Sequence, residues 1–370
     1  MNKKLVSLDI IKGIGIIMII IVHNRHFIMQ NMSTVWSVIN FGQMGCQLFF
    51  FVSGFSLCYA WEHMNFSRHK ALRFILRRYL RLAPGFLIFM TVNLALNILL
   101  MDILHFPPGF IINREPRAML TNVLFLHGLF PEYINNGFPG GWYIGTAFLL
   151  YAVFPLLYSI LRRLHAVHPL CMAVVPALLL VLNCILQHNV SVLSEGSLPV
   201  GNSTFLYYFF MNQLPCFSLG ILLFSRKDNI QTPLALSALL SIASAGICLC
   251  LYVYPPKPFV FTVLPTIAGL SAYWFAAGLI RAESRRPFVS PVSRFLASCG
   301  RNSYGMYLCH SLVCWYGMKA MTYLITQNGI AYNDLLLYGL MFLPSVFVVY
   351  VMGRCTELLL TRIDHRLRHT

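Results

Sequence analysis

The sequence predicts an all-α integral membrane protein, a bundle of about ten transmembrane helices with both termini in the cytoplasm. Hydrophobic residues make up 58% of the 370 residues and charged residues only 10%, whereas soluble domains carry about 25% charge. Blocks without charge, such as Ile14–Val22 and Phe86–Met101, indicate helices, because the strands of a membrane barrel alternate apolar and polar residues. A soluble or disordered protein is therefore excluded.

Ten apolar segments approach the roughly 20 residues that a helix needs to cross a bilayer. The first contains Asp9 and Lys12 and has no small-residue cleavage site, so we interpret it as a retained helix rather than a signal peptide. The predicted spans are residues 5–26, 45–62, 82–102, 141–161, 169–187, 204–224, 232–253, 260–280, 302–325 and 334–355.

Lysines and arginines divide unequally between the two sides that these spans define. The side of the N-terminus carries 21 of them and the opposite side carries 4. Membrane proteins concentrate Lys and Arg in cytoplasmic loops, so both termini are expected in the cytoplasm. The same rule explains the net charge of +16 without nucleic acid as a partner.

The chain is expected to form a single transmembrane domain, residues 1–370, with no soluble domain. Its longest predicted outer loop, residues 103–140, contains an apolar stretch, 118–130, that is too short to span and fits an interfacial or re-entrant segment. Long loops of this kind often cover a site. Most of the eleven cysteines lie in apolar blocks and none forms a CxxC pair, so no disulfide, metal site or haem is expected.

The first helix carries three ionisable residues, Asp9, Lys12 and His23. Lys12 and His23 are eleven positions apart, which places them on one helix face about 16 Å apart, and Asp9 is close enough to pair with Lys12. Because ionisable groups within spans are functional candidates, this face could carry chemistry. Alternatively, Lys12 reaches the inner interface and His23 marks the outer boundary. His26 lies about 60° off this face and is expected to be dispensable.

Arginines recur at helical spacing before the third span, at Arg73, Arg77, Arg78 and Arg81. If this segment is helical, it presents a stripe of guanidinium groups at the cytoplasmic face, and the planar fork of guanidinium suits phosphate. The alternative is a topology signal that contacts anionic lipid.

Other polar groups within the spans have plainer explanations. Ser53 and Gly54 interrupt the second span and favour close helix packing. Trp142 lies at the outer boundary, where aromatic residues gather in any case. His310, in the ninth span, is more typical of a hydrogen bond to a neighbouring helix than of catalysis. The chain has no nucleotide-loop, zinc-peptidase or serine-hydrolase motif.

Taken in order, five motifs resemble the acyltransferase-3 family, whose multi-span members O-acylate cell-surface polysaccharides and other acceptors. They are a basic residue followed after ten positions by His, a Phe-Phe-x-x-Ser-Gly signature, an Arg-x-x-Arg pair, a Trp…Tyr…Pro stretch and a late Ser-Tyr…His motif. In this chain they are Lys12 to His23, Gly45–Gly54, Arg78 to Arg81, Trp142 to Pro155 with Tyr151 between, and Gly300–His310. The resemblance covers residues 8 to about 310.

The resemblance implies transfer of an acyl group, expected to be acetyl, from cytoplasmic acyl-CoA to a hydroxyl of a cell-envelope glycan or glycolipid. It also implies a bacterial inner-membrane location and no tightly bound cofactor. The expected catalytic residues are His23, Asp9 and Lys12. The expected donor-binding residues are Arg78 and Arg81, which hold the CoA phosphates, with Ser53 and Gly54. The expected acceptor-binding residues are Trp142, Tyr304 and His310.

Two departures from the family pattern qualify this interpretation. Lys12 replaces the commoner Arg but keeps its charge, whereas Ala147 stands where many members have an acidic residue. No role for that carboxylate can be transferred. A different class of function, a transporter or channel that uses Lys12 and His23 as a proton or ion path, is the main alternative, and a membrane scaffold without activity is another. The missing internal repeats argue against the transporter.

Overall fold

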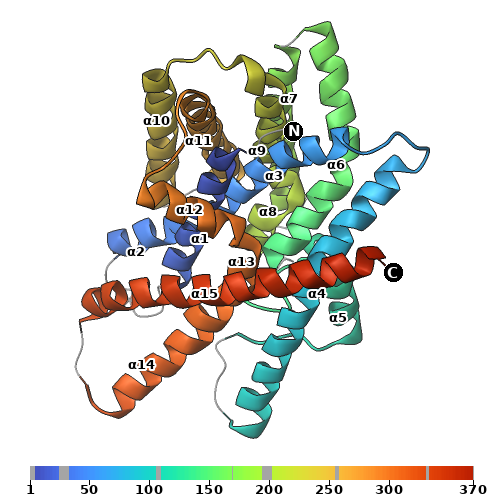
Figure 1. Ribbon diagram of the computed structural model, residues 1–370. Coiled ribbons are helices and arrows are strands. Elements are labelled where there is room, and N and C mark those ends of the chain that lie inside the picture. The colour runs from blue at the N-terminus through green and yellow to red at the C-terminus, as the bar shows by residue number, and fades with distance from the viewer. Residues whose placement is uncertain are drawn as a thin grey trace.

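The computed structural model describes residues 5–24, 33–105, 110–168, 170–193, 202–254, 258–330 and 333–369. These residues form a helical bundle without strands (Figure 1), and nine of its helical stretches are long and apolar enough to cross a membrane. The main helices are α1 (Val6–His23), α3 (Gly45–Glu62), α4 (Lys70–Ile98), α6 (Trp142–Val167), α7 (Cys171–Leu193), α9 (Phe210–Arg226), α10 (Leu234–Val253), α11 (Pro258–Arg285) and α15 (Asp334–His369). The predicted all-α bundle of membrane-crossing helices is therefore confirmed.

The ninth predicted span, 302–325, differs from the others. It consists of α13 (Ser303–Ser311), a π-helical segment η6 (Leu312–Gly317) and α14 (Met318–Gln327). It is not among the nine stretches that are apolar enough to cross, because polar residues such as Ser303, Tyr304 and His310 lower its hydropathy. These polar residues face the interior: Ser303 and His310 are buried, and the Tyr304 hydroxyl donates to the carbonyl of Leu82 in α4.

The third span begins earlier than the sequence predicts. Helix α4 starts at Lys70 rather than near residue 82 and carries the arginine stripe on its first turns. It continues into a π-helical segment, η3 (Leu99–Ile103). The segment from Arg73 to Arg81 is therefore helical, as a stripe of guanidinium groups on one helix face requires.

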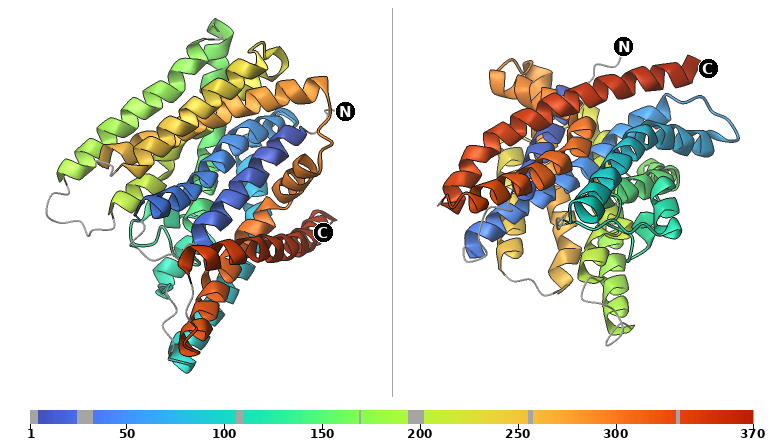
Figure 2. Two further views of the ribbon diagram at one scale, coloured as in Figure 1. Left: turned by 90° about the vertical axis from the view of Figure 1, so that its left-hand side faces the viewer. Right: turned by 90° about the horizontal axis from the view of Figure 1, so that it is seen from below.

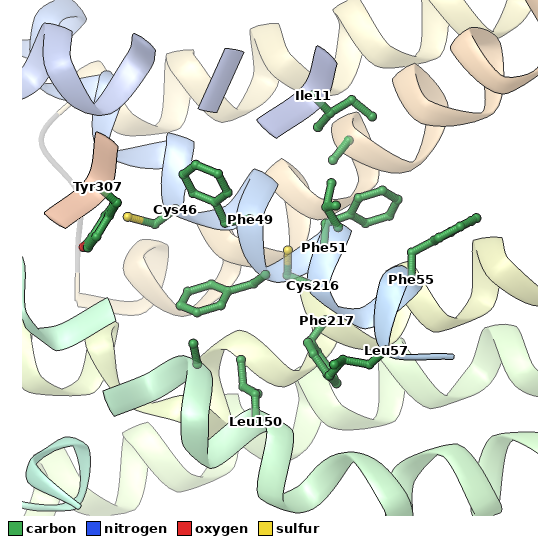
Figure 3. Close-up of a cluster of buried hydrophobic side chains, with 14 of the residues drawn as sticks. Ile11, Cys46, Phe49, Phe51, Phe55, Leu57, Leu150, Cys216, Phe217 and Tyr307 are labelled. Atoms are coloured by element: carbon green, nitrogen blue, oxygen red, sulfur yellow. The ribbon is translucent and has the colours of Figure 1, made fainter. Parts of the chain in front are cut away.

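The core surrounds α3, which packs between α1 and α9 (Figure 2). Phe51, Phe55 and Phe217 are fully buried within it (Figure 3). A β-carbon on Gly54 would lie 2.1 Å from the carbonyl oxygen of Phe217, and one on Gly220 would lie 2.0 Å from that of Phe51. Only glycine permits this approach of α3 and α9, which supports helix packing as the role of Gly54.

The short helices η2 (Phe41–Met44), α2 (Ser33–Asn40), α8 (Asn202–Tyr208), η5 (Lys227–Asn229) and α12 (Pro291–Arg301) connect the long helices. Helix α12 lies along α1. A β-carbon on Gly300 of α12 would lie 1.7 Å from the carbonyl oxygen of Asp9. This contact fixes the segment of α1 that carries Asp9 and Lys12.

The outer loop folds back against the bundle. Its described part contains α5 (Pro116–Val123) and η4 (His127–Leu129), and the side chains of Phe125, His127 and Phe138 are fully buried. The His127 ring stacks on Phe86 with centroids 5.8 Å apart. Burial lowers the pKa of His127 to about 4, so this imidazole is neutral near pH 7. It is a packing residue, and it holds the loop over one end of α6.

Candidate active site

Three cavities follow one another through the bundle and share lining residues. The arginine cavity, of about 600 Å³, is lined by Ala60, Met64, Phe74, Arg77, Arg78, Leu80, Arg81 and Asp364. The central cavity, of about 200 Å³, shares Arg78 and Arg81 with it and also contains Lys12. The histidine cavity, of about 160 Å³, contains His23 and shares Tyr307 with the central cavity.

Lys12 enters the central cavity with its charge balanced. Its Nζ lies 2.7 Å from Oδ1 of Asp9, whose side chain is only 3% exposed. The pair predicted from the sequence is therefore confirmed. Because Asp9 is buried behind it and is not among the residues that line the cavity, Lys12 presents the cation of the pair to the cavity.

Arg78 and Arg81 lie where the arginine and central cavities meet. The Arg78 guanidinium carbon lies 5.2 Å from the centroid of the Phe74 ring, and its buried Nε has no hydrogen-bond partner among the described residues. Arg81 donates to Glu357 of α15 over 3.1 Å. Glu357 is mostly buried and also accepts the Gly305 N–H over 3.2 Å. No sequence signal indicated Glu357, because it lies 276 positions from Arg81.

Hydroxyl groups line the rest of the central cavity. The Ser53 hydroxyl lies 3.3 Å from that of Tyr151, and the Tyr304 hydroxyl donates to the carbonyl of Leu82 over 2.5 Å. Ala147 also lines this cavity, so the missing family carboxylate would have pointed into it. Gly54 is not among the residues that line it.

The histidine cavity combines His23 with flat rings and amides. Trp142 stacks on Tyr208 with centroids 4.1 Å apart and an interplanar angle of 15°. Gln43 and Asn135 also line the cavity, and the buried carboxamide oxygen of Asn135 has no hydrogen-bond partner among the described residues. Rings with apolar faces and amides that both donate and accept suit a ligand rich in hydroxyls.

Tyr307 separates the central and histidine cavities. Its hydroxyl donates to the carbonyl of Gly140 over 2.6 Å, and its ring lies 4.8 Å from that of Tyr143 between centroids. Figure 3 shows the side chain beside Cys46 and Phe49. Gly140 has φ +88°, a conformation that glycine adopts readily, so the outer loop can turn sharply toward Tyr307.

The structure distributes the sequence-predicted residues between two neighbouring cavities. Lys12, Ser53, Arg78, Arg81 and Tyr304 line the central cavity, and His23 and Trp142 line the histidine cavity. His310 is buried, with its ring centroid 4.7 Å from that of His23. Sequence reasoning missed Glu357 and Tyr307 as site residues, and His26 lies outside the described residues. No three His, Cys, Asp or Glu side chains within the described ranges could hold a metal ion.

A many-helix membrane protein with charged and histidine side chains along internal cavities is either a membrane-embedded enzyme or a transporter. Residues 5–354 match the family model Acyl_transf_3, described as an acyltransferase domain. The chain therefore belongs to the acyltransferase-3 family, and its class is that of a multi-pass membrane acyltransferase. The resemblance predicted from the five motifs is confirmed. Neither the curated proteins nor the solved structures yielded a match.

Proposed function

We propose that this protein transfers an acyl group, acetyl in the simplest case, from cytoplasmic acyl-CoA to a hydroxyl of a cell-envelope glycan or glycolipid. The observation that carries the proposal is the row of three adjoining cavities, with Arg78 and Arg81 where the first two meet and His23 in the third. A donor that enters beside the arginines and an acceptor that enters beside His23 would meet near Tyr307.

The donor half of the proposal assigns phosphate binding to Arg78 and Arg81. Their guanidinium groups can each donate two parallel hydrogen bonds to phosphate oxygens. The pantetheine arm would then extend through the central cavity, past Lys12 and Ser53, and bring the thioester to Tyr307. Lys12 lies about 16 Å along α1 from His23 and is held by Asp9, so its cation would attract the anionic donor into this cavity rather than contact the reacting carbonyl.

The acceptor half assigns the general base to His23. Imidazole titrates near neutrality and is therefore suited to remove the proton of a hydroxyl. Trp142 and Asn135 would hold a sugar ring beside it. Tyr304 lines the central cavity, so we assign it to the donor side rather than to the acceptor.

The membrane placement that goes with this proposal is the bacterial inner membrane, with both termini and the arginine cavity on the cytoplasmic side. The 21 to 4 distribution of Lys and Arg supports it. In this orientation acyl-CoA enters the arginine cavity from the cytoplasm. The histidine cavity then faces the envelope, where glycan acceptors are assembled.

The test is a paired measurement on purified protein in lipid nanodiscs, with radiolabelled acetyl-CoA and an extracted envelope glycan fraction. His23→Ala should bind CoA normally and lose about 10²- to 10⁴-fold in transfer rate. His63→Ala, an exposed histidine at the end of α3, is the matched control and should be unchanged. His26→Ala should also be active.

Three outcomes would contradict the proposal. Near-normal transfer by His23→Ala would show that His23 is not the general base. Loss of transfer in His26→Ala instead would place the base one helical turn further along the chain. Ion or solute flux through vesicles that needs no acyl-CoA would favour the transporter.

A further inference from the structure

His310 lies against the proposed base without lining any of the three cavities. It comes from α13, whereas His23 ends α1, and the two ring centroids are 4.7 Å apart at an interplanar angle of 59°. The His310 side chain is fully buried. The two rings are therefore in contact, and no hydrogen bond joins them in this arrangement. A rotation of the His23 ring would bring one of its nitrogens within hydrogen-bond distance of His310.

The hydrogen bonding of His310 defines its tautomer. Its Nδ1 forms a hydrogen bond with the backbone carbonyl of Tyr307. Since a carbonyl oxygen only accepts, Nδ1 carries the proton, and the neutral ring keeps its lone pair on Nε2. This Nε2 is buried and has no hydrogen-bond partner within the described part of the chain. Buried acceptors are rarely left unpaired, and the exceptions call for a functional explanation.

The surroundings hold the His310 ring at this place. The Tyr307 ring lies 4.9 Å from it between centroids. A β-carbon on Gly140 would lie 3.4 Å from Nε2 of His310, so the outer loop borders this nitrogen closely. The π-helical segment η6 begins directly after α13, and such segments in α-helices often occur at functional sites.

Carboxylates, the usual partners that orient a catalytic imidazole, are committed elsewhere. Asp9 pairs with Lys12, and Glu357 pairs with Arg81. Ala147 occupies the family's acidic position, and the described residues that line the histidine cavity include no Asp or Glu.

We propose that His310 is the positioning residue for His23: its Nε2 accepts an N–H from the His23 ring and thereby directs the other His23 nitrogen, with its lone pair, at the acceptor hydroxyl. The inference rests on the proposed function. In the reaction, the acceptor O–H bond breaks and its proton moves to His23. The oxygen bonds the acyl carbon, the carbon–sulfur bond breaks, and the proton ends on the CoA thiolate. His310 keeps its own proton throughout.

Three substitutions of His310 separate this role from packing. His310→Ala should lower the rate constant of transfer by about 10- to 100-fold, the loss that removal of the partner of a metal-bound histidine typically causes, with CoA affinity and the acceptor KM unchanged. His310→Gln can place its carboxamide oxygen near the original Nε2 and should restore most of the rate. His310→Asn reaches only the Nδ1 position and should remain as slow as His310→Ala.

A double substitution tests whether His310 acts through His23. If it does, His310→Ala should cause no further loss in the His23→Ala background. Equal activity of the Gln and Asn variants, or an independent loss in the double variant, would overturn the inference even if His310→Ala folds poorly. Full activity of His310→Ala together with an inactive His23→Ala would overturn it and leave the proposed function intact. An active His23→Ala would instead refute the proposed function.

Discussion

Arg81 of α4 and Glu357 of α15 form an ion pair, with 3.1 Å between Nη2 and Oε2. The Glu357 side chain is 11% exposed and that of Arg81 is 39% exposed, so the pair lies at the border between protein and cavity. Its carboxylate also accepts the Gly305 N–H. Glu357 therefore connects the arginine to two helices, α13 and α15, and fixes where its remaining donors point.

Glu357→Gln is expected to weaken CoA binding by about 3- to 10-fold, because an Arg81 side chain without its partner samples more conformations before it binds phosphate. Isothermal titration with CoA measures this. In the Arg81→Ala background the same substitution should have no effect on affinity. A gain in affinity from Glu357→Gln would mean instead that Glu357 competes with the ligand for Arg81.

Arg78→Ala and Arg81→Ala should each weaken CoA binding by about 10- to 150-fold, since a charge-assisted hydrogen bond contributes roughly 1.5–3 kcal/mol. Arg→Lys at either position should recover only part of the affinity, because the bidentate fork is lost. Arg73→Ala is the matched control, since Arg73 is exposed on the same helix and lines neither cavity. Unchanged affinity in both alanine variants would show that the stripe is only a topology signal.

The orientation of the protein is tested by labelling single cysteines in a variant depleted of the eleven native ones. A cysteine at position 366 should react only with reagent that reaches the cytoplasmic face. Glu132→Cys, at an exposed position of the outer loop, should react only from the opposite face. The reverse pattern would invert the proposed membrane orientation.

Local sequence patterns predicted the features that depend on neighbours along the chain. Apolar blocks predicted the helices, and spacing predicted the pairing of Asp9 with Lys12, because residues three apart share a helix face. The start of α4 was misplaced because its first turns carry the arginines and are too polar to be recognised by hydropathy. The ninth span was predicted as one apolar helix, but its polar residues face the interior.

The partners that complete the site could not be predicted, because they are set by tertiary packing. Glu357 meets Arg81 only when α15 crosses α4, and His310 meets His23 only when α13 packs against α1. Tyr307 was part of a recognised motif, but its position between two cavities depends on the carbonyl of Gly140 in the outer loop. Without several sequences to compare, no periodicity or spacing connects residues so distant in the chain.

The structural role of Lys12, which pairs with Asp9, can be separated from its chemical role by substitution. Lys12→Met should lower stability by about 1–3 kcal/mol, because it removes the cation that lies 2.7 Å from the buried Asp9 carboxylate. Adding Asp9→Asn should restore most of that stability, since the negative charge that Lys12 balanced is removed. Acyl transfer should stay low, because the cation in the central cavity is still missing. Lys12→Arg keeps the cation and should retain both properties. Thermal unfolding in detergent and the transfer assay together measure this, and a double variant that regains both stability and transfer would reduce Lys12 to a packing partner of Asp9.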